Sequence, residues 1–199
     1  MRNLVRALSV VIVLIAAVAI AATKEKLAAN ASAAKLPAHY ETATLAGGCF
    51  WSMQENLRQI PGVIKTTVGY TGGTAPNPTY EMVSTGKTGH AEAVEVIFDP
   101  AKLSYEELLN HFFRIHDPTT LHRQINVAGA QYRSAIFYHS EEQSRAAGRV
   151  KDKINQSGKW NRPAVTEVTK ATTFYPAEEY HQDYFHKTSS ARTCRSSWD

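Results

Sequence analysis

Apolar and polar residues follow two different periods along the chain. A period of two over residues 90–98 predicts a strand, which the breaker Asp99-Pro100 ends. A period of three to four over residues 104–115 predicts a helix, and Ser104 with Glu107 forms a capping box at its start. The same reasoning predicts the following further segments: strands at 40–46, 63–70, 131–139 and 165–171, and helices at 50–59, 140–154 and 176–187. Helices that alternate with strands in this way predict a single α+β domain, a sheet with helices packed against it.

Two connecting segments lack these periods. Residues 71–79 are rich in Gly, Pro and Asn and are predicted to form a loop, and residues 80–88 show no regular pattern. A further loop is expected to run from the helix at 104–115 to Gly129.

Residues 1–36 differ in composition from the rest of the chain. Arg2 and Arg6 precede an apolar run over residues 7–22 that ends in small residues, which is the pattern of a secretory signal peptide. The run is short for a transmembrane helix, which takes about 20 apolar residues, and an uncleaved membrane anchor is the alternative. We interpret residues 23–36 as a linker and residues 37–199 as the folded domain with a flexible C-terminal tail. The protein is therefore expected to be exported to a bacterial periplasm or cell envelope, released or membrane-anchored.

The formal net charge of +4 belongs to residues 1–36. Five of the 22 basic residues and one of the 18 acidic residues fall there, so the remainder carries 17 of each and is neutral. Proteins that bind nucleic acid by neutralising phosphates carry a net basic face. Composition therefore gives no indication of a nucleic-acid partner.

One of the two cysteines lies on the predicted turn between a strand and a helix, in Gly47-Gly48-Cys49-Phe50-Trp51. The glycines allow a sharp bend and leave room for a ligand to approach. The first turn of a helix carries unpaired N–H groups and partial positive charge, which favour the reactive thiolate form of a cysteine. Phe50 and Trp51 place an apolar wall beside this nucleophile.

Polar residues in the strand at 90–98 and near other strand ends are candidates for proton donors. Alternation puts Glu92 on a face with three large apolar residues, where a raised pKa keeps a carboxyl protonated near neutral pH. The alternative is a carboxylate at a strand end that reaches water, and alternation does not separate the two. Glu95 lies on the other face and is expected to be solvated. Tyr80 and Tyr132 each offer a phenol donor, or are ordinary tyrosines at the edge of a core.

Cys194 leaves two interpretations open. In an oxidising compartment it pairs with Cys49 as a structural clamp on the tail. Alternatively, it is a second redox thiol that attacks Cys49 after that residue has been oxidised. The histidines predict no metal site, because His181 and His186 are five residues apart and no His-Glu-x-x-His motif occurs.

A series of short motifs runs in one order from about Thr44 to Lys187. These are Gly-Gly-Cys-Phe-Trp (47–51), Val-Gly-Tyr-Thr-Gly-Gly (68–73), Asn-Pro-Thr-Tyr (77–80), Thr-Gly-His-Ala-Glu-Ala-Val (88–94), Phe-Asp-Pro (98–100), His-Asp-Pro-Thr (116–119), Gln-Tyr-Arg-Ser-Ala-Ile (131–136) and Tyr-His-Gln-Asp-Tyr (180–184). They closely resemble the motifs of type A peptide methionine sulfoxide reductases. The resemblance implies a two-layer α+β domain with a mixed sheet, related to the ferredoxin-like arrangement. It also implies reduction of methionine S-sulfoxide, free or in oxidised proteins, without a metal or organic cofactor.

The resemblance gives each candidate residue a role. Cys49 looks like the thiolate that attacks the sulfoxide sulfur, beside an apolar pocket for the methyl group that Phe50 and Trp51 form. Glu92 looks like the acid that protonates the leaving oxygen. The hydrogen-bond donors that hold this oxygen look like Tyr80 and Tyr132.

The resemblance also implies how the enzyme is regenerated. The sulfenic acid left on Cys49 would form a disulfide with a resolving cysteine near the C-terminus, and Cys194 is the candidate. The motif Asn-Pro-x-Gly-Tyr that usually precedes this cysteine is absent, so the assignment rests on position. A thioredoxin or thioredoxin-like protein would reduce the disulfide. A monomer is the expected state.

The chain departs from the family pattern beside the expected pocket. The usual Gly-Asn-Asp is here Ile125-Asn126-Val127, and the following Thr is Ala130. Loss of a buried carboxylate removes an orienting partner for Tyr132. The alternative functions are therefore a degenerate member that binds oxidised methionine with weak or no turnover, and a thiol-based peroxide sensor.

Overall fold

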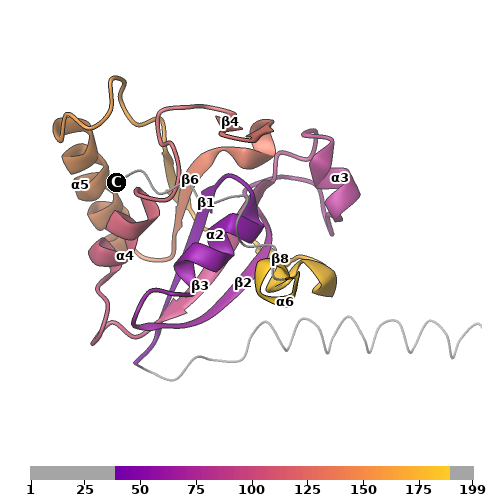
Figure 1. Ribbon diagram of the computed structural model, residues 1–199, viewed down its shortest axis with the longest axis horizontal. Helices are drawn as coiled ribbons and strands as arrows, with labels where there is room; N and C mark the ends of the chain where they lie inside the picture. Colours follow the sequence, from indigo (N-terminus) through magenta and orange to yellow (C-terminus); the bar gives the residue numbers. More distant parts are fainter. Residues whose placement is uncertain (1–38, 189–199) are drawn as a thin grey trace, which may run out of the picture. The chain divides into compact units, whose positions relative to one another are not determined.

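The computed structural model of the chain describes residues 39–188 (Figure 1). The predicted signal peptide or anchor (1–22), the linker (23–36) and Cys194 lie outside the described residues. Within residues 39–188, no helix combines the length and the apolar character that a membrane span requires.

A six-stranded sheet forms the centre of the fold, in the order β7-β6-β1-β3-β2-β8. Its strands are β1 (Glu41–Gly47), β2 (Val63–Thr71), β3 (Ala91–Phe98), β6 (Ser134–Tyr138), β7 (Glu167–Lys170) and β8 (Tyr175–Pro176). The neighbours are antiparallel except for β6 and β7, which are parallel. The expected α+β domain with a mixed sheet is confirmed.

Three longer helices each follow a strand of this sheet. Helix α2 (Phe50–Leu57) follows β1, α4 (Tyr105–Phe112) follows β3, and α5 (Glu141–Gln156) follows β6. The predicted capping box is confirmed, because the Ser104 hydroxyl accepts from the Glu107 N–H while the Glu107 carboxylate accepts from the Ser104 N–H. Such reciprocal bonds satisfy two donors at a helix start and fix where α4 begins.

The helices cover one face of the sheet. The main core joins strand and helix side chains that include Leu45, Val68, Val94, Val96, Phe98, Ile136, Phe50, Met53, Leu57, Leu108, Phe112 and Val150. On the other face a smaller cluster comprises Ala46, Ala91, Ala93, Ala135 and Phe137, with Ala171 and Phe174 packed against it. The two faces predicted for β3 by alternation are therefore confirmed, and Glu92 belongs to the face that the helices cover.

Two segments that were expected to be irregular or extended contain short helical turns. Residues 80–88 were predicted to be irregular, but α3 (Tyr80–Ser84) forms there because the Thr79 side chain caps it by accepting from the Met82 N–H. The strand predicted over residues 131–139 starts later than expected. Its first residues belong to the 3₁₀ turn η1 (Ala130–Tyr132), and β6 begins at Ser134.

The single helix predicted over residues 176–187 is wrong. The segment is divided into β8, the 3₁₀ turn η2 (Glu179–His181) and α6 (Tyr184–Thr188). Asp183 separates the last two elements, with a φ of 53° in the left-handed region that interrupts a helix. Its N–H donates to Gln54 Oε1 at 2.8 Å, so a contact with α2 stabilises the break.

Candidate active site

Cys49 lies on the predicted strand-to-helix turn, which is confirmed. Strand β1 ends at Gly47, and Cys49 is the N-cap residue of α2, with a half-buried side chain. Gly48 has a φ of 111°, a conformation that favours glycine. Both glycines are closely approached, since a Cβ on Gly47 would lie 2.9 Å from His116 Cγ and one on Gly48 would lie 3.0 Å from Gln124 Cγ. The thiol is therefore held at the positive end of a helix by a tightly packed turn.

Glu92 is buried, with 3% of its surface exposed. Burial raises the pKa of this carboxyl to about 7, although a hydrogen bond from the Phe50 N–H opposes the shift. That bond joins Phe50 N to Glu92 Oε2 at 3.0 Å, so the carboxyl contacts the residue next to Cys49. Of the two interpretations left open by alternation, the buried carboxyl is correct.

Glu95 was expected to be solvated and is instead half-buried. Strand β3 lies between β1 and β2, and its neighbours shield this side chain. Burial raises the pKa of the Glu95 carboxyl, and the charge of Lys65 opposes the shift. Glu95 nevertheless lies on the opposite face from Glu92 and takes no part in the Cys49 site.

The Tyr132 phenol interacts electrostatically with three other predicted site residues, Cys49, Glu92 and Tyr80. Burial raises the pKa of the Tyr132 phenol to about 12, and the charges of Glu92, Tyr80 and Cys49 add to the shift. Electrostatic interaction weakens with distance, so these contributions indicate that the Tyr132 phenol lies within electrostatic range of Glu92, Tyr80 and Cys49. Tyr80 is half-buried at the first position of α3, and Tyr132 is half-buried in η1.

The two aromatic residues that follow Cys49 in the chain belong to a cluster of rings. Phe50 is 1% exposed and Trp51 is half-buried. The Trp51 ring stacks on Tyr184, with ring centroids 3.9 Å apart and planes inclined by 12°. The indole Nε1–H donates to His181 Nδ1 at 3.1 Å, so Trp51 is fixed both by stacking and by a hydrogen bond.

His181 is a site residue that sequence reasoning missed. Its ring is 1% exposed and lies 5.2 Å from the Phe50 ring and 4.4 Å from the Tyr80 ring, measured between centroids. Burial lowers the pKa of this imidazole, and the Glu178 carboxylate opposes the shift. Because Nδ1 accepts from Trp51, the proton of the neutral ring is assigned to Nε2. The motif at 180–184 was noted in the sequence, but nothing in it indicated this contact.

Glu178 is a second residue that the sequence did not reveal. Its Oε1 accepts from the Tyr80 N–H and its Oε2 accepts from the Tyr70 hydroxyl, both at 2.9 Å. Burial alone would raise the pKa of this carboxyl, but these hydrogen bonds bring it below its ordinary value. Conversely, burial and the bond to Glu178 raise the pKa of the Tyr70 phenol. One carboxylate therefore fixes the start of α3, where Tyr80 lies.

The residues that replace the family pattern lie in the segment that leads to Tyr132. Val127 is half-buried in β5 (Val127–Ala128), which pairs with β4 (Arg123–Gln124) in a hairpin. Tyr132 is held by its two neighbours, because Gln131 Nε2 donates to Ser84 O at 3.4 Å and Arg133 Nη1 donates to Ala130 O at 3.1 Å. These contacts position the Tyr132 backbone without a carboxylate at position 127.

The hairpin is fixed against the turn that carries Cys49. Gln124 Nε2 donates to Asp117 O, and Gln124 Oε1 accepts from the Asp117 N–H, both at 2.8 Å. The same side chain lies against Gly48, as the close approach to a Cβ there indicates. The hairpin therefore borders the site.

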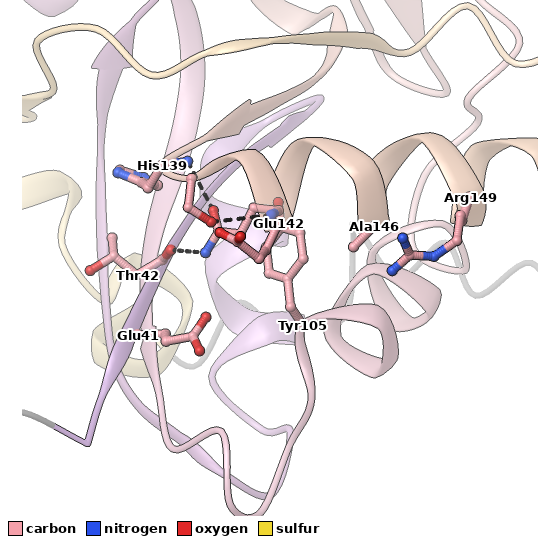
Figure 2. Close-up of a pocket in the computed structure, with 9 residues that line it drawn as sticks. Glu41, Thr42, Tyr105, His139, Glu142, Ala146 and Arg149 are labelled. Atoms are coloured by element: carbon pink, nitrogen blue, oxygen red, sulfur yellow. Dashed lines mark hydrogen bonds between the residues drawn. The ribbon is translucent and has the colours of Figure 1, made fainter.

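The described residues contain no group of three or more His, Cys, Asp or Glu side chains that could hold a metal ion. A separate cavity of about 600 Å³ lies at the start of β1 and α5 and is lined by Glu41, Thr42, Tyr105, His139, Ser140, Glu142, Gln143, Ala146 and Arg149 (Figure 2). Its polar groups bond to one another, as when Gln143 accepts from the His139 N–H and donates to Thr42 O. None of the predicted site residues lines it.

The fold and the site define a class of protein. A half-buried thiol at a helix N-terminus, with a carboxyl of pKa about 7 and two phenols beside it, is typical of a cysteine-dependent enzyme that also needs a proton donor. A family model described as peptide methionine sulfoxide reductase matches residues 41–199. The chain belongs to the peptide methionine sulfoxide reductase family.

Known proteins with similar sequences and structures agree with this. A peptide methionine sulfoxide reductase MsrA of Methanoculleus marisnigri is 51% identical over 158 residues, which are 79% of this chain and 96% of that protein. Mxr1 from Saccharomyces cerevisiae in reduced form is 34% identical, with a TM-score of 0.75, over 81% of this chain and 92% of that chain. Mxr1 in complex with Trx2 is 29% identical, with a TM-score of 0.54, over 74% of this chain and 86% of that chain. The resemblance identified from the motifs is confirmed.

Proposed function

We propose that this protein reduces the S-epimer of methionine sulfoxide, free or in oxidised proteins, to methionine. The observation that carries the proposal is the 3.0 Å hydrogen bond from the Phe50 N–H to Glu92 Oε2. It fixes a carboxyl whose pKa is about 7 beside the residue that follows the thiol. A nucleophile and an acid that is protonated in about half of the molecules at neutral pH therefore act on one substrate group.

The reaction transfers oxygen from the substrate sulfur to Cys49. The thiolate attacks the sulfoxide sulfur while Glu92 gives a proton to the oxygen, because a hydroxyl leaves far more readily than an oxide. Tyr80 and Tyr132 donate hydrogen bonds to the oxygen as charge develops on it. The bond that the attack forms between the two sulfurs then breaks together with the S–O bond, as the protonated oxygen moves to the Cys49 sulfur. The substrate leaves as methionine, and Cys49 is left as a sulfenic acid, so the substrate sulfur is reduced by two electrons and the cysteine is oxidised by two.

Phe50 and Trp51 hold the methyl group of the substrate. A methyl group has no polar atoms, so a wall of rings accepts it at no cost in hydrogen bonds. The Trp51 ring is fixed by Tyr184 and His181, which keeps this wall in one position. In the R-epimer the methyl group and the oxygen exchange places, so the oxygen would face the aromatic wall and the methyl group would face the proton donors. This mismatch supports stereospecificity for the S-epimer.

Cys194 is proposed to regenerate the enzyme. Its thiolate attacks the Cys49 sulfenic acid, a disulfide forms and water leaves. A thioredoxin or thioredoxin-like dithiol then reduces the disulfide and becomes oxidised. The solved complex of Mxr1 with Trx2 supports a thioredoxin as the partner. Residues 1–22 are proposed to direct export to a periplasm or cell envelope, where the protein acts as a monomer and binds no nucleic acid.

A stereospecific single-turnover assay tests the proposal. The reduced full-length protein should form one equivalent of methionine from a methionine S-sulfoxide substrate and none from the R-epimer. Cys49→Ser should form none from either, and retained reduction would refute the mechanism. Cys194→Ser should complete the first turnover but stop there with thioredoxin as the reductant.

Val127 favours one alternative, a degenerate member that binds oxidised methionine without efficient turnover. In that case the wild-type protein would bind the S-sulfoxide and reduce it at a rate near the uncatalysed one. A peroxide sensor would instead form a Cys49 disulfide with peroxide but not with the sulfoxide.

A further inference from the structure

Most of the exposed large apolar side chains belong to segments that border the Cys49 site. Among the described residues, the large apolar side chains that are exposed are Ile64, Met82, Leu121, Ile125 and Tyr180. All of these except Ile64 belong to segments that border the site, and their exposed fractions range from 40% to 65%. Exposed apolar residues scattered one by one need no explanation, but a group of them beside a site indicates a binding surface.

Leu121 and Ile125 belong to the β4–β5 hairpin on one side of Cys49. Leu121 precedes β4, and Ile125 lies in the turn between the paired residues Gln124 and Val127. The Gln124 side chain packs against Gly48, so the hairpin adjoins the residue before Cys49. Leu121 is 65% exposed and Ile125 is 56% exposed.

Met82 and Tyr180 lie on the side of the site that carries Tyr80 and His181. Met82 is in α3, two residues after Tyr80. The Tyr180 ring lies 4.2 Å from the His181 ring between centroids, and His181 in turn lies 4.4 Å from the Tyr80 ring. In Figure 1, β4 and α3 are at the same end of the sheet, near the start of α2.

We propose that these four side chains form an apolar rim (Met82, Leu121, Ile125 and Tyr180) that binds apolar residues flanking an oxidised methionine in an extended polypeptide. The proposal rests on the proposed function, because only a chain whose sulfoxide reaches Cys49 brings its neighbouring residues to the rim. Each extended residue spans about 3.5 Å, so two neighbours on either side reach about 7 Å from the sulfoxide.

Continuity with the Cys49 site is the argument for this occupant. The hairpin contacts Gly48, the residue before Cys49. Helix α3 begins at Tyr80, one of the proposed donors to the substrate oxygen. Ile125 lies at the tip of the hairpin and is exposed, so the tip is apolar. A peptide that enters the site buries this tip, and burial of exposed apolar surface is favourable.

The test compares two peptides in single-turnover reduction by the reduced full-length protein. Both carry one methionine S-sulfoxide, flanked on each side by two Leu residues in one peptide and by two Ser residues in the other. The wild type should reach half-saturation at a roughly tenfold lower concentration of the Leu peptide, equivalent to about 1.4 kcal/mol. The rate at saturation should be the same for both, because the rim binds substrate and transition state equally.

The double variant Leu121→Ser/Ile125→Ser should lose this preference and still reduce N-acetyl-methionine S-sulfoxide at the wild-type rate. The matched control is Ile64→Ser, since Ile64 is 48% exposed but follows Val63, which pairs with Phe98 at the far end of β3 from Glu92. This control should keep the preference. Both substitutions fall on exposed side chains, so both variants should fold.

Two results would overturn the rim proposal and leave the proposed function intact: equal half-saturation of the wild type by the two peptides, or an unchanged preference in the double variant. The double variant could instead keep its single-turnover preference but turn over more slowly with thioredoxin, equally for both peptides. That result would mean that the rim binds the reductant or the C-terminal tail and not the substrate. Failure of the wild type to reduce any S-sulfoxide would refute the proposed function itself.

Discussion

Replacing Glu92 with Gln removes the proton donor and keeps the shape of the side chain. Gln retains an oxygen that can accept from the Phe50 N–H, the bond observed at 3.0 Å. Burial raises the pKa of Glu92 from 4.5 to about 7. At pH 7 about half of the carboxyls are then protonated, against about 0.3% at the ordinary pKa, so the environment increases the amount of available acid roughly 150-fold.

The expected consequence is a large loss of rate and a changed pH profile. General acid catalysis contributes about 100-fold to 10,000-fold, and Glu92→Gln should slow single-turnover reduction of an S-sulfoxide by about this range. In the wild type the rate should fall as the pH rises through about 7, because Glu92 loses its proton there. The variant should lack that fall, because Gln has no proton to lose in this range.

Stability provides an independent measurement on the same variant. The folded protein binds the Glu92 proton more tightly than the unfolded chain does, so this residue makes the free energy of unfolding decrease as the pH rises from 4.5 to about 7. The full effect is about 3 kcal/mol at the top of this range. Glu92→Gln should remove most of this decrease, measured by denaturant unfolding at pH 5 and pH 8.

Glu95→Gln is the matched control, because Glu95 is on the same strand but on the opposite face. It should leave the single-turnover rate and the position of its pH dependence unchanged. A Glu92→Gln rate within about threefold of the wild type, or a variant that keeps the fall in rate near pH 7, would show that Glu92 is not the acid.

Three further substitutions test the surroundings of the site. Tyr132→Phe removes one donor to the developing oxygen charge and should lower the single-turnover rate about 100-fold, with little change in half-saturation. Glu178→Gln leaves either the Tyr70 hydroxyl or the Tyr80 N–H without its acceptor. It should lower the free energy of unfolding by about 1 to 3 kcal/mol and slow reduction. The same substitution at the exposed neighbouring residue, Glu179→Gln, should have neither effect. Gly48→Ala places a Cβ 3.0 Å from Gln124 at a φ of 111°, and it should destabilise the fold by about 1 to 3 kcal/mol in urea unfolding. The control is Gly148→Ala in α5, where a Cβ meets nothing within 4 Å; this substitution should stabilise the fold slightly. An unchanged unfolding midpoint in Gly48→Ala would contradict the description of this turn.

The features that local sequence patterns decide could be predicted. Alternation along β3 assigned Glu92 to the face of Val94 and Val96, and the structure buries all three on the face that the helices cover. The pair of glycines before Cys49 indicated a sharp turn, and Gly48 adopts a positive φ there. Both predictions depend on residues within a few positions of one another.

The features that distant contacts decide could not be predicted. Glu178 meets Tyr80 and Tyr70 across 98 and 108 positions, and no local pattern connects them. The helix expected at 176–187 failed for a similar reason, because Pro176 pairs with Gly69 in the sheet and Asp183 bonds to Gln54 of α2. Glu95 was expected to be solvated because alternation shows which face a residue takes, but not how well its neighbours shield that face.

The most direct test of the account is a titration of the Glu92 carboxyl itself in the reduced protein. Infrared difference spectra of the wild type against Glu92→Gln isolate the carboxyl stretch of this residue. A protonated carboxyl that titrates with a midpoint near pH 7 is the predicted result. A midpoint near 4.5, the ordinary value, would mean that no acid is available beside Cys49 at neutral pH and would contradict the mechanism.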